Sequence, residues 1–245
     1  MTNCCWPFKF VAILLSCLFA FPAINGQTSS SNQSSALNAA ITYFNNEIGE
    51  DAHLYTGKEY SPYEKGIKGH PFFESPEMES NSIFYDGILY TNIPLLFDIV
   101  RQEVVINRYK QDVRIKLLSE KIKYFTFSGH RFENMALTGG KDESTSTGIY
   151  DIVFNGKVKV LIKRFKRIKN SLKAEDPPAF VEEDEFFIRN GTRLFAVDNK
   201  GSLLDALKDK KDLIKTFTRK NKFRFKKNIE MELKMATAYY STLNS

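Results

Sequence analysis

The feature that most constrains the fold is an alternation of apolar and lysine-bearing positions that recurs between about Ser82 and Val197. From 157 to 163, Val158, Val160 and Ile162 take every second position and lysines take most of the others. The runs 113–117 and 121–126 show the same period of two. This period is typical of antiparallel strands with one face buried and one face in water. The sequence therefore predicts a sheet whose outer face carries lysine.

Three dipeptides predict hairpin turns between such strands. Asp86-Gly87, Asn155-Gly156 and Asn190-Gly191 are each flanked by apolar, β-branched or aromatic residues. An Asn-Gly or Asp-Gly pair in that setting is the strongest local signal of a two-residue hairpin. Short connections between successive strands predict an antiparallel β-meander of some eight to ten strands, curled or barrel-like so that its edges are protected.

Helices are expected at both ends of this strand-rich region. Apolar residues recur at i, i+4, i+7 and i+11 from Leu37, with Ser35 as a possible N-cap and Gly49 as a stop, which predicts one N-terminal helix. Two to three helices are predicted over about 202–243, the first capped by Ser202. Their apolar stripes are narrow, so we expect them to pack on the sheet rather than form a separate bundle. The fold class is mainly β with α.

The first 26 residues have the layout of a secretory signal peptide. Lys9 precedes an apolar run of 14 residues, Phe10 to Ala23, and Gly26 offers a small residue before a polar tail. The run is too short to span a membrane. We expect cleavage between Gly26 and Gln27, a disordered polar leader over 27–35, and a single β-rich domain over 36–245. The protein is then exported, and its place is periplasmic, outer-membrane associated or extracellular.

All the cysteines lie inside this N-terminal segment. After cleavage the chain has no cysteine, so disulfides, thiolate metal sites and cysteine nucleophiles are excluded together. Leu14 to Cys17 (LLSC) resembles a bacterial lipobox, and acylation of Cys17 would anchor the chain to a membrane. The apolar run continues for six residues beyond Cys17, which favours the soluble interpretation.

Charge is unevenly distributed along the chain. Residues 27–150 hold 12 Lys+Arg against 16 Asp+Glu, whereas residues 151–245 hold 22 against 13. Such asymmetry can mark an anionic partner, although solvated strand and helix faces are the favoured interpretation. The basic run 163–169 fits an edge strand, with a glycan or lipid-headgroup site as the alternative, and the acidic run 182–185 fits a solvated loop. Export argues against nucleic acid as a partner.

No catalytic, cofactor-binding or metal-ligating residue is predicted. His53, His70 and His130 are the only histidines, and no two of them have ligand spacing. His130 follows Ser128-Gly129 and fits a hairpin turn. No GxSxG, GxGxxG or GxxxxGK[ST] motif occurs, which leaves serine hydrolysis and nucleotide binding unsupported. Scattered carboxylates that act as a pair stay open, since their separation in space is not visible in a sequence.

An irregular segment from Leu54 to Glu79 is rich in Gly, Pro and aromatic residues. A loop of this length that carries so many aromatic side chains is expected to pack on a core or to line a cleft. His70 lies between Gly69 and Pro71, and such a fixed histidine could act as an acid or a base, or could anchor the loop. The residues that would form a binding surface here are Tyr60, Tyr63, His70, Phe72 and Phe73.

Several phrases together resemble a family of exported proteins common in Bacteroidota, to which no activity is assigned. They are IGEDAHLYTGKEY, GHPFF, SIFYDGILYTNIPLLFDIV, KIKYFTFSGHRF, GIYDIVFNGKVKVLIKRFKRI and DLIKTFTRKNKFRFKKN, with the closing Tyr239-Tyr240. The resemblance covers most of the chain from about Ala36 onward. It implies a Gram-negative envelope setting and transfers no catalytic residue.

Three hypotheses of function follow. The favoured one is a non-catalytic envelope protein that binds a ligand or partner, such as an envelope protein, a glycan or a small molecule, or serves a structural role. The second is a carbohydrate or peptide hydrolase that uses carboxylates with His70, which requires a desolvated acidic residue beside that histidine. The third is a lipid-anchored surface component, which requires acylated Cys17; membrane attachment is expected only in that case.

Overall fold

The computed structural model describes residues 53–138, 145–173 and 175–243, together with five isolated positions between 35 and 43. The predicted signal peptide, the cleavage site at Gly26 and Gln27, and Cys17 lie outside the described residues, as does nearly all of the 27–35 leader. The predicted N-terminal helix falls largely outside them too and is not confirmed. Within the described part of the chain, no helix is long and apolar enough to cross a membrane.

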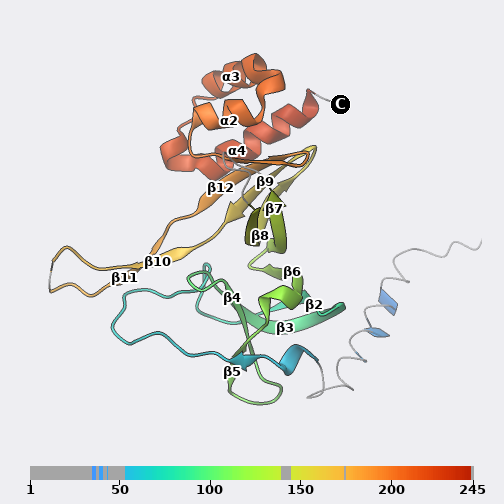
Figure 1. Cartoon of the computed structure of the whole chain (residues 1–245), viewed down its shortest axis with the longest axis vertical. Helices are drawn as coiled ribbons and strands as arrows, with labels where there is room; N and C mark the ends of the chain where they lie inside the picture. Colours follow the sequence, from blue (N-terminus) through green and yellow to red (C-terminus); the bar gives the residue numbers. More distant parts are fainter. Residues whose placement is uncertain are drawn as a thin grey trace, which may run out of the picture.

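One large antiparallel sheet of 11 strands organises the molecule (Figure 1). In spatial order it contains β1 (Lys58–Glu59), β5 (Arg114–Lys116), β4 (Glu103–Asn107), β3 (Ile88–Asp98), β2 (Glu79–Tyr85), β6 (Ile122–Phe127), β7 (His130–Thr138), β8 (Thr145–Asn155), β9 (Val158–Lys163), β12 (Glu185–Asn190) and β13 (Arg193–Ala196). The predicted antiparallel meander is confirmed in coarse form, because most strands pair with their neighbours in sequence. The chain forms two such meanders, β2 to β5 and β6 to β9, which join where β2 pairs with β6.

The sheet does not close into a barrel, so that part of the prediction is wrong. Strands β1 and β13 lie at opposite ends of the strand order and do not pair with each other. They are short, at two and four residues. Short edge strands offer few unpaired backbone groups to another chain, so the sheet protects its edges without closure.

The turn signals differ in how closely they match the hairpins. Asp86 and Gly87 both have positive φ, 50° and 84°, and join β2 to β3 as predicted. Gly191 also has positive φ, but the turn between β12 and β13 is Gly191-Thr192, because Asn190 pairs directly with Arg193. The β8–β9 hairpin forms with Asn155 opposite Lys159, so three residues separate the paired positions instead of two.

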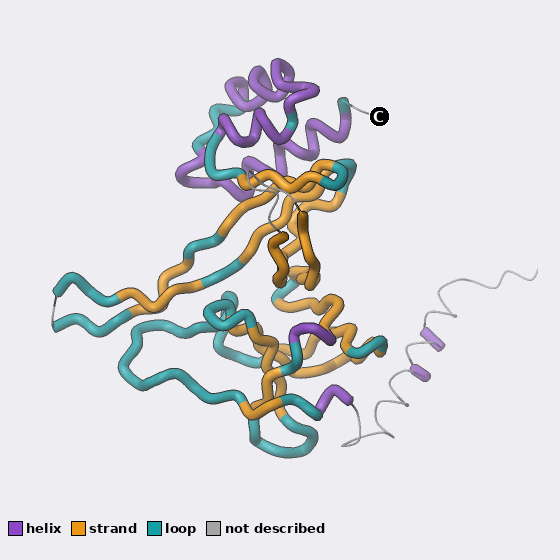
Figure 2. Tube along the Cα trace, in the orientation of Figure 1, coloured by secondary structure: helices purple, strands orange, loops and turns teal. Residues whose placement is uncertain are grey.

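Strands β10 (Lys166–Lys169) and β11 (Ala179–Glu182) form a separate two-stranded ribbon that projects from the body of the sheet (Figures 1 and 2). The basic run 163–169 therefore enters an edge ribbon, as predicted. Its charges are nevertheless not all solvated. Arg164 and Lys166 are buried, and Arg167 and Lys169 both contact Glu183.

Three C-terminal helices cover one end of the sheet, α2 (Lys200–Ala206), α3 (Lys211–Lys220) and α4 (Phe225–Thr242). Helix α4 contacts β8 and β9, and α2 contacts β12 and β13, so the prediction of packing on the sheet is confirmed for these two helices; α3 contacts α2 and α4. The cap of α2 differs from the prediction. Asn199 is the N-cap, and Ser202 is the third helical residue of a reciprocal capping box.

Buried side chains gather in two main clusters along the sheet. The first lies among β1 to β7 and is rich in aromatic rings, with the Phe125 and Phe132 centroids 5.0 Å apart and Phe97 5.1 Å from Phe132. The second joins the sheet to the helices and includes Leu233 and Tyr240 of α4.

Candidate functional site

The aromatic segment between β1 and β2 is largely part of the core. Tyr60, Phe72 and Phe73 are buried, and Tyr63 and His70 are half-buried. The ring of Phe73 packs edge-on against Phe132 with centroids 5.2 Å apart. Three of the five residues predicted as a binding surface are therefore core residues, because rings of this size contribute more stability when they are packed than when they line open solvent.

Asp98 fixes this segment, although nothing in the sequence singled it out. Its carboxylate is fully buried and accepts hydrogen bonds from the Tyr60 hydroxyl at 2.9 Å and the Tyr63 hydroxyl at 3.1 Å. It also accepts from the backbone N–H groups of Val100 and Arg101. Burial, followed by the charge of Asp98, raises the pKa of both tyrosines. The tyrosines are thus held as neutral donors to a buried anion.

His70 has a structural environment. Its ring stacks on Phe72 with centroids 6.3 Å apart. Below the loop, the Lys166 ammonium donates to the carbonyl oxygens of Phe72 at 2.7 Å and His70 at 3.3 Å. Burial and the charge of Lys166 lower the pKa of His70. Within the described chain, the His70 side chain forms neither a hydrogen bond nor an ion pair with a carboxylate, so the desolvated partner required by the hydrolase hypothesis is not in contact.

The densest group of charged side chains surrounds Arg164, which is buried. Its guanidinium donates from Nη2 to Asp151 Oδ2 at 2.7 Å and from Nη1 to Asp184 Oδ2 at 2.7 Å. Nη2 also lies 2.9 Å from Glu230 Oε2 on α4. His130 Nδ1 lies 2.8 Å from the same Asp151 oxygen. We call these five residues the Arg164 cluster. It brings together β7, β8, the start of β12 and α4.

The contacts of the cluster set its protonation. The hydrogen bond to Asp151 raises the pKa of His130 despite burial. Burial raises the pKa of Asp184, although Arg164 opposes this effect. Burial disfavours the cationic form of Arg164, but its contacts with Asp184 and Asp151 outweigh burial and raise its pKa. The cluster thus holds three carboxylates against one guanidinium, and the protonation of His130 changes its net charge.

A cavity of about 220 Å³ opens beside the cluster. It is lined by Phe73, Glu74, Ile99, His130, Arg164, Glu182, Asp184 and Glu230. None of these residues carries a hydroxyl or thiol nucleophile. Among the described residues, no three His, Cys, Asp or Glu side chains are arranged to hold a metal ion. The arrangement can store and exchange a proton at His130, and two of the carboxylates that line the cavity, Asp184 and Glu230, are held by Arg164.

The acidic run 182–185 is not the solvated loop that the sequence predicted. Glu182 lies 3.7 Å from Lys166, Glu183 lies 2.5 Å from Arg167, and Asp184 pairs with Arg164. The backbone N–H of Phe165 also donates to Asp184. The acidic run neutralises the basic run, because β9–β10 and β11–β12 lie side by side as antiparallel partners.

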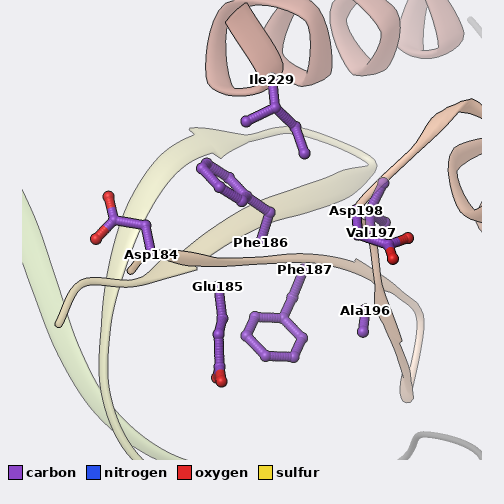
Figure 3. Close-up of a pocket in the computed structure, with 8 residues that line it drawn as sticks. All are labelled: Asp184, Glu185, Phe186, Phe187, Ala196, Val197, Asp198 and Ile229. Carbon is purple, nitrogen blue, oxygen red and sulfur yellow. The ribbon is translucent and has the colours of Figure 1, made fainter. Parts of the chain in front are cut away.

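A larger groove of about 540 Å³ lies where β12, β13 and α4 meet, and we call it the β12 groove (Figure 3). It is lined by Asp184, Glu185, Phe186, Phe187, Ala196, Val197, Asp198 and Ile229. Figure 3 shows Phe186 pointing toward Ile229 on α4, whereas Glu185 and Phe187 point to the other side of the strand, as the period of two requires. Sites of this volume accommodate small ligands or a few residues of a peptide.

The groove exists because two neighbouring strands end at different points. Strand β12 pairs with β9 from Glu185 onward but with β13 only from Phe187 onward. After Ala196 the chain leaves the sheet, and Val197 donates one last hydrogen bond to the Phe186 carbonyl at 2.8 Å. The first two residues of β12 therefore have no paired residue of β13 on one edge. Helix α4 lies beside them.

Charge in the groove has one sign. Its eight lining residues include three carboxylates and no lysine or arginine. Asp184 is held by Arg164, and Asp198 accepts from the Ser202 hydroxyl at 3.0 Å. Glu185 is exposed and, in the described structure, forms no ion pair; Lys163 lies opposite it on β9. The groove thus combines an apolar surface with a carboxylate that is free to bind.

Sequence reasoning missed the residues that carry both sites. Asp151 interrupts an otherwise apolar strand, GIYDIVF, and a charged residue at a buried strand position is a usable signal of a paired charge. Asp98 ends the apolar run of β3 and offers a weaker signal. The β12 groove has no signal in the sequence, because it depends on where β13 stops relative to β12. No protein-family model, curated protein or solved structure matches this chain.

Proposed function

We propose that this chain is a non-catalytic binding module of the cell envelope, and that its ligand site is the β12 groove. The observation that carries the proposal is the lining of the groove, in which five apolar residues are combined with three carboxylates and no cation. Export itself rests on the sequence of residues 1–26.

The lining favours a ligand with an apolar body and a cationic group. Phe186, Val197 and Ile229 provide the contact area that stabilises an apolar group through removal of water. Glu185 supplies a charge that no residue of the described structure neutralises by an ion pair. Glu185 and Phe187 point to one side of β12 and Phe186 to the other, so a ligand that spans this open strand edge would place its cation against Glu185 and its apolar body against the rings, whereas an anion would meet three carboxylates.

The state of the basic and acidic side chains supports a non-catalytic role. A general base needs a free lone pair within reach of a substrate proton. In the Arg164 cluster, Nδ1 of His130 lies 2.8 Å from Asp151 and Nε2 lies 3.5 Å from Glu74, and Asp184 and Glu230 contact Arg164. These contacts fix the positions of β8, β12 and α4 relative to one another, which is the role of a structural ion-pair network.

Fluorescence titration with two matched probes tests the proposal. Dansylcadaverine carries an ammonium group and dansylglycine a carboxylate on the same apolar fluorophore, and the chain after residue 26 has no tryptophan to interfere. We expect the cationic probe to bind and the anionic probe not to. Glu185→Gln should weaken binding roughly two- to fivefold, since an exposed charge pair contributes about 0.2–1 kcal/mol.

Glu175→Gln is the matched control, because Glu175 is exposed and does not line the groove. Equal binding of both probes, or equal effects of the two variants, would contradict the proposal. Native mass spectrometry of protein isolated from its envelope fraction adds an independent readout. A reproducible adduct that Phe186→Ala abolishes would identify the natural ligand by mass.

A further inference from the structure

The corner between α3 and α4 carries a concentration of unpaired positive charge. From Leu213 to Ile229 the chain has no Asp or Glu and seven basic residues. They are Lys215, Arg219, Lys220, Lys222, Arg224, Lys226 and Lys227. All seven are exposed, and none forms an ion pair in the described part of the chain. We call residues 215–235 the α3–α4 corner.

Packed aromatic rings and backbone hydrogen bonds fix the conformation of this corner. Phe217 stacks on Tyr239 with centroids 4.3 Å apart, and Phe223 packs edge-on against Phe217 at 5.8 Å. The N–H of Phe223 donates to the Thr218 carbonyl at 3.1 Å. The N–H of Arg224 donates to the carboxylate of Glu232, which is buried. The cations are therefore displayed by a packed turn.

Exposed apolar side chains accompany these cations. Met231 and Met235 are 60% and 38% exposed and lie one helical turn apart on α4. They line a hollow of about 370 Å³ together with Phe223, the cations Lys222 and Arg224, and the polar residues Asn221, Asn228 and Glu232. Methionine is flexible and adapts to irregular apolar partners. Two exposed methionines beside a group of cations differ from the basic surfaces that bind phosphate backbones, which recognise charge and stacking faces.

We propose that the α3–α4 corner docks on an anionic lipid bilayer. Lysine and arginine near such a surface are attracted to acidic headgroups, and apolar side chains enter the boundary between headgroups and acyl chains. Charge complementarity selects the occupant. The N-terminal segment 27–52 contains Glu47, Glu50 and Asp51 without any basic residue, but three carboxylates leave most of the seven cations unmatched and provide no apolar boundary for Met231 and Met235, whereas an anionic bilayer provides both. This docking needs no acyl group on Cys17 and is independent of the β12 groove.

Vesicle flotation tests the inference. The protein is isolated from the fraction to which it is exported, and its N-terminus is established by intact mass, so that a retained apolar run is recognised. Vesicles of phosphatidylglycerol and phosphatidylethanolamine are compared with vesicles of phosphatidylcholine alone. We expect binding only to the anionic vesicles, with a loss of at least about tenfold in the variant K222Q/R224Q/K226Q/K227Q, because each cation near the surface contributes several-fold.

The matched control removes four other exposed cations that form no ion pair in the described structure, K58Q/K65Q/R108Q/K173Q. We expect this control variant to bind within about twofold of the unaltered protein. The nonspecific attraction that depends on net charge alone is reduced equally in the control and corner variants. Met231→Ser with Met235→Ser should reduce the binding that survives in 0.5 M salt, since screening removes charge attraction and leaves apolar contact. Thermal unfolding of each variant confirms that it is folded.

Two results would overturn the inference. One is equal loss in the corner and control variants, which would show that net charge alone drives binding. The other is retention of the protein on heparin or duplex DNA without flotation on anionic vesicles, which would assign the corner to a polyanion. Failure of flotation leaves the probe titration at the β12 groove unaffected, so the two proposals can fail separately.

Discussion

At the scale of single residues, the buried charged side chains determine the local geometry of this protein more than the exposed ones do. Asp98 and Asp151 are almost completely buried; Asp98 accepts hydrogen bonds at both oxygens, and Asp151 accepts from Arg164 at Oδ2. A buried carboxylate is tolerated when several donors replace its lost hydration, and it then fixes the geometry of those donors. Asp98 thereby anchors the loop that bears Tyr60 and Tyr63.

Asp98→Asn should lower the free energy of unfolding by about 1–3 kcal/mol, because a neutral amide accepts more weakly and cannot satisfy both tyrosine hydroxyls. Urea denaturation measures the change. Asp112→Asn is the control, since Asp112 is exposed in the β4–β5 connection and should shift stability by less than about 0.5 kcal/mol. Equal shifts in the two variants would mean that the Asp98 contacts contribute nothing specific.

The pKa values of His130 and His70 should be displaced in opposite directions from 6.5, the ordinary value for histidine. Asp151 raises the pKa of His130, and burial lowers the pKa of His70. Stability from His130 is therefore full below its unfolded pKa and is lost as pH rises through its higher folded pKa. For His70, stability is full above the unfolded pKa and falls as pH drops through the lower folded value.

Proton NMR of the imidazole signals, assigned with His130→Gln and His70→Gln, measures both midpoints directly. We expect the His130 midpoint above 6.5 and the His70 midpoint below it. Coincident midpoints would refute the contacts described for His130. A His130→Gln protein should also lose the part of the pH dependence of stability that lies above pH 6.5.

At the scale of elements, ends matter as much as periodicity. The apolar stripe of α4 was visible in the sequence, and Leu233, Ala236 and Tyr240 are buried as that stripe requires. The start of α2 was misplaced, because Ser202 and Asn199 are both good capping residues and only the backbone decides between them. Asn199 has an extended conformation, with φ at −155°, and accepts from the N–H groups of Gly201 and Ser202.

Asn199→Ala should destabilise the protein by about 1 kcal/mol, within the range of about 0.5–2 for the loss of an N-cap. Thermal or urea unfolding gives the value. Asn199→Asp is the matched variant, since aspartate keeps the capping oxygen and should retain most of the stability. If alanine and aspartate behave alike, the cap does not hold α2 and the end of the β12 groove in place.

At the scale of the whole molecule, Arg164 joins elements that are far apart in the chain. Its three carboxylate partners come from β8, from the residue before β12 and from α4. Removal of this guanidinium leaves the buried Asp151 with His130 alone and Asp184 without an ion-pair partner in the described structure, whereas Glu230 keeps Lys234. The same cluster separates the small cavity from the β12 groove, since Asp184 lines both.

Arg164→Gln should therefore lower the free energy of unfolding by about 3–5 kcal/mol. Arg167→Gln is the control from the same basic run. Arg167 is exposed and pairs with Glu183, so its loss should change stability by about 1 kcal/mol or less. Urea denaturation at pH 7 distinguishes the two, and similar values would show that burial gives Arg164 no special role.

The sequence by itself determined the two-residue period of the strands, the position of a turn, and the buried face of α4. Alternation predicted the antiparallel strands, Asp86-Gly87 predicted its turn, and the stripe of α4 predicted its buried face, because each of these is decided by residues a few positions apart. Tertiary structure alone decided that the sheet stays open, that 182–185 neutralises 163–169, and that β13 stops short of the start of β12. Each of these three features depends on which distant segments of the chain become neighbours. Whether a charged side chain is solvated or paired depends on the segment that lies next to it. The α3–α4 corner belongs to the same group, since Met231 and Met235 come next to Lys222 and Phe223 only through the turn between the two helices.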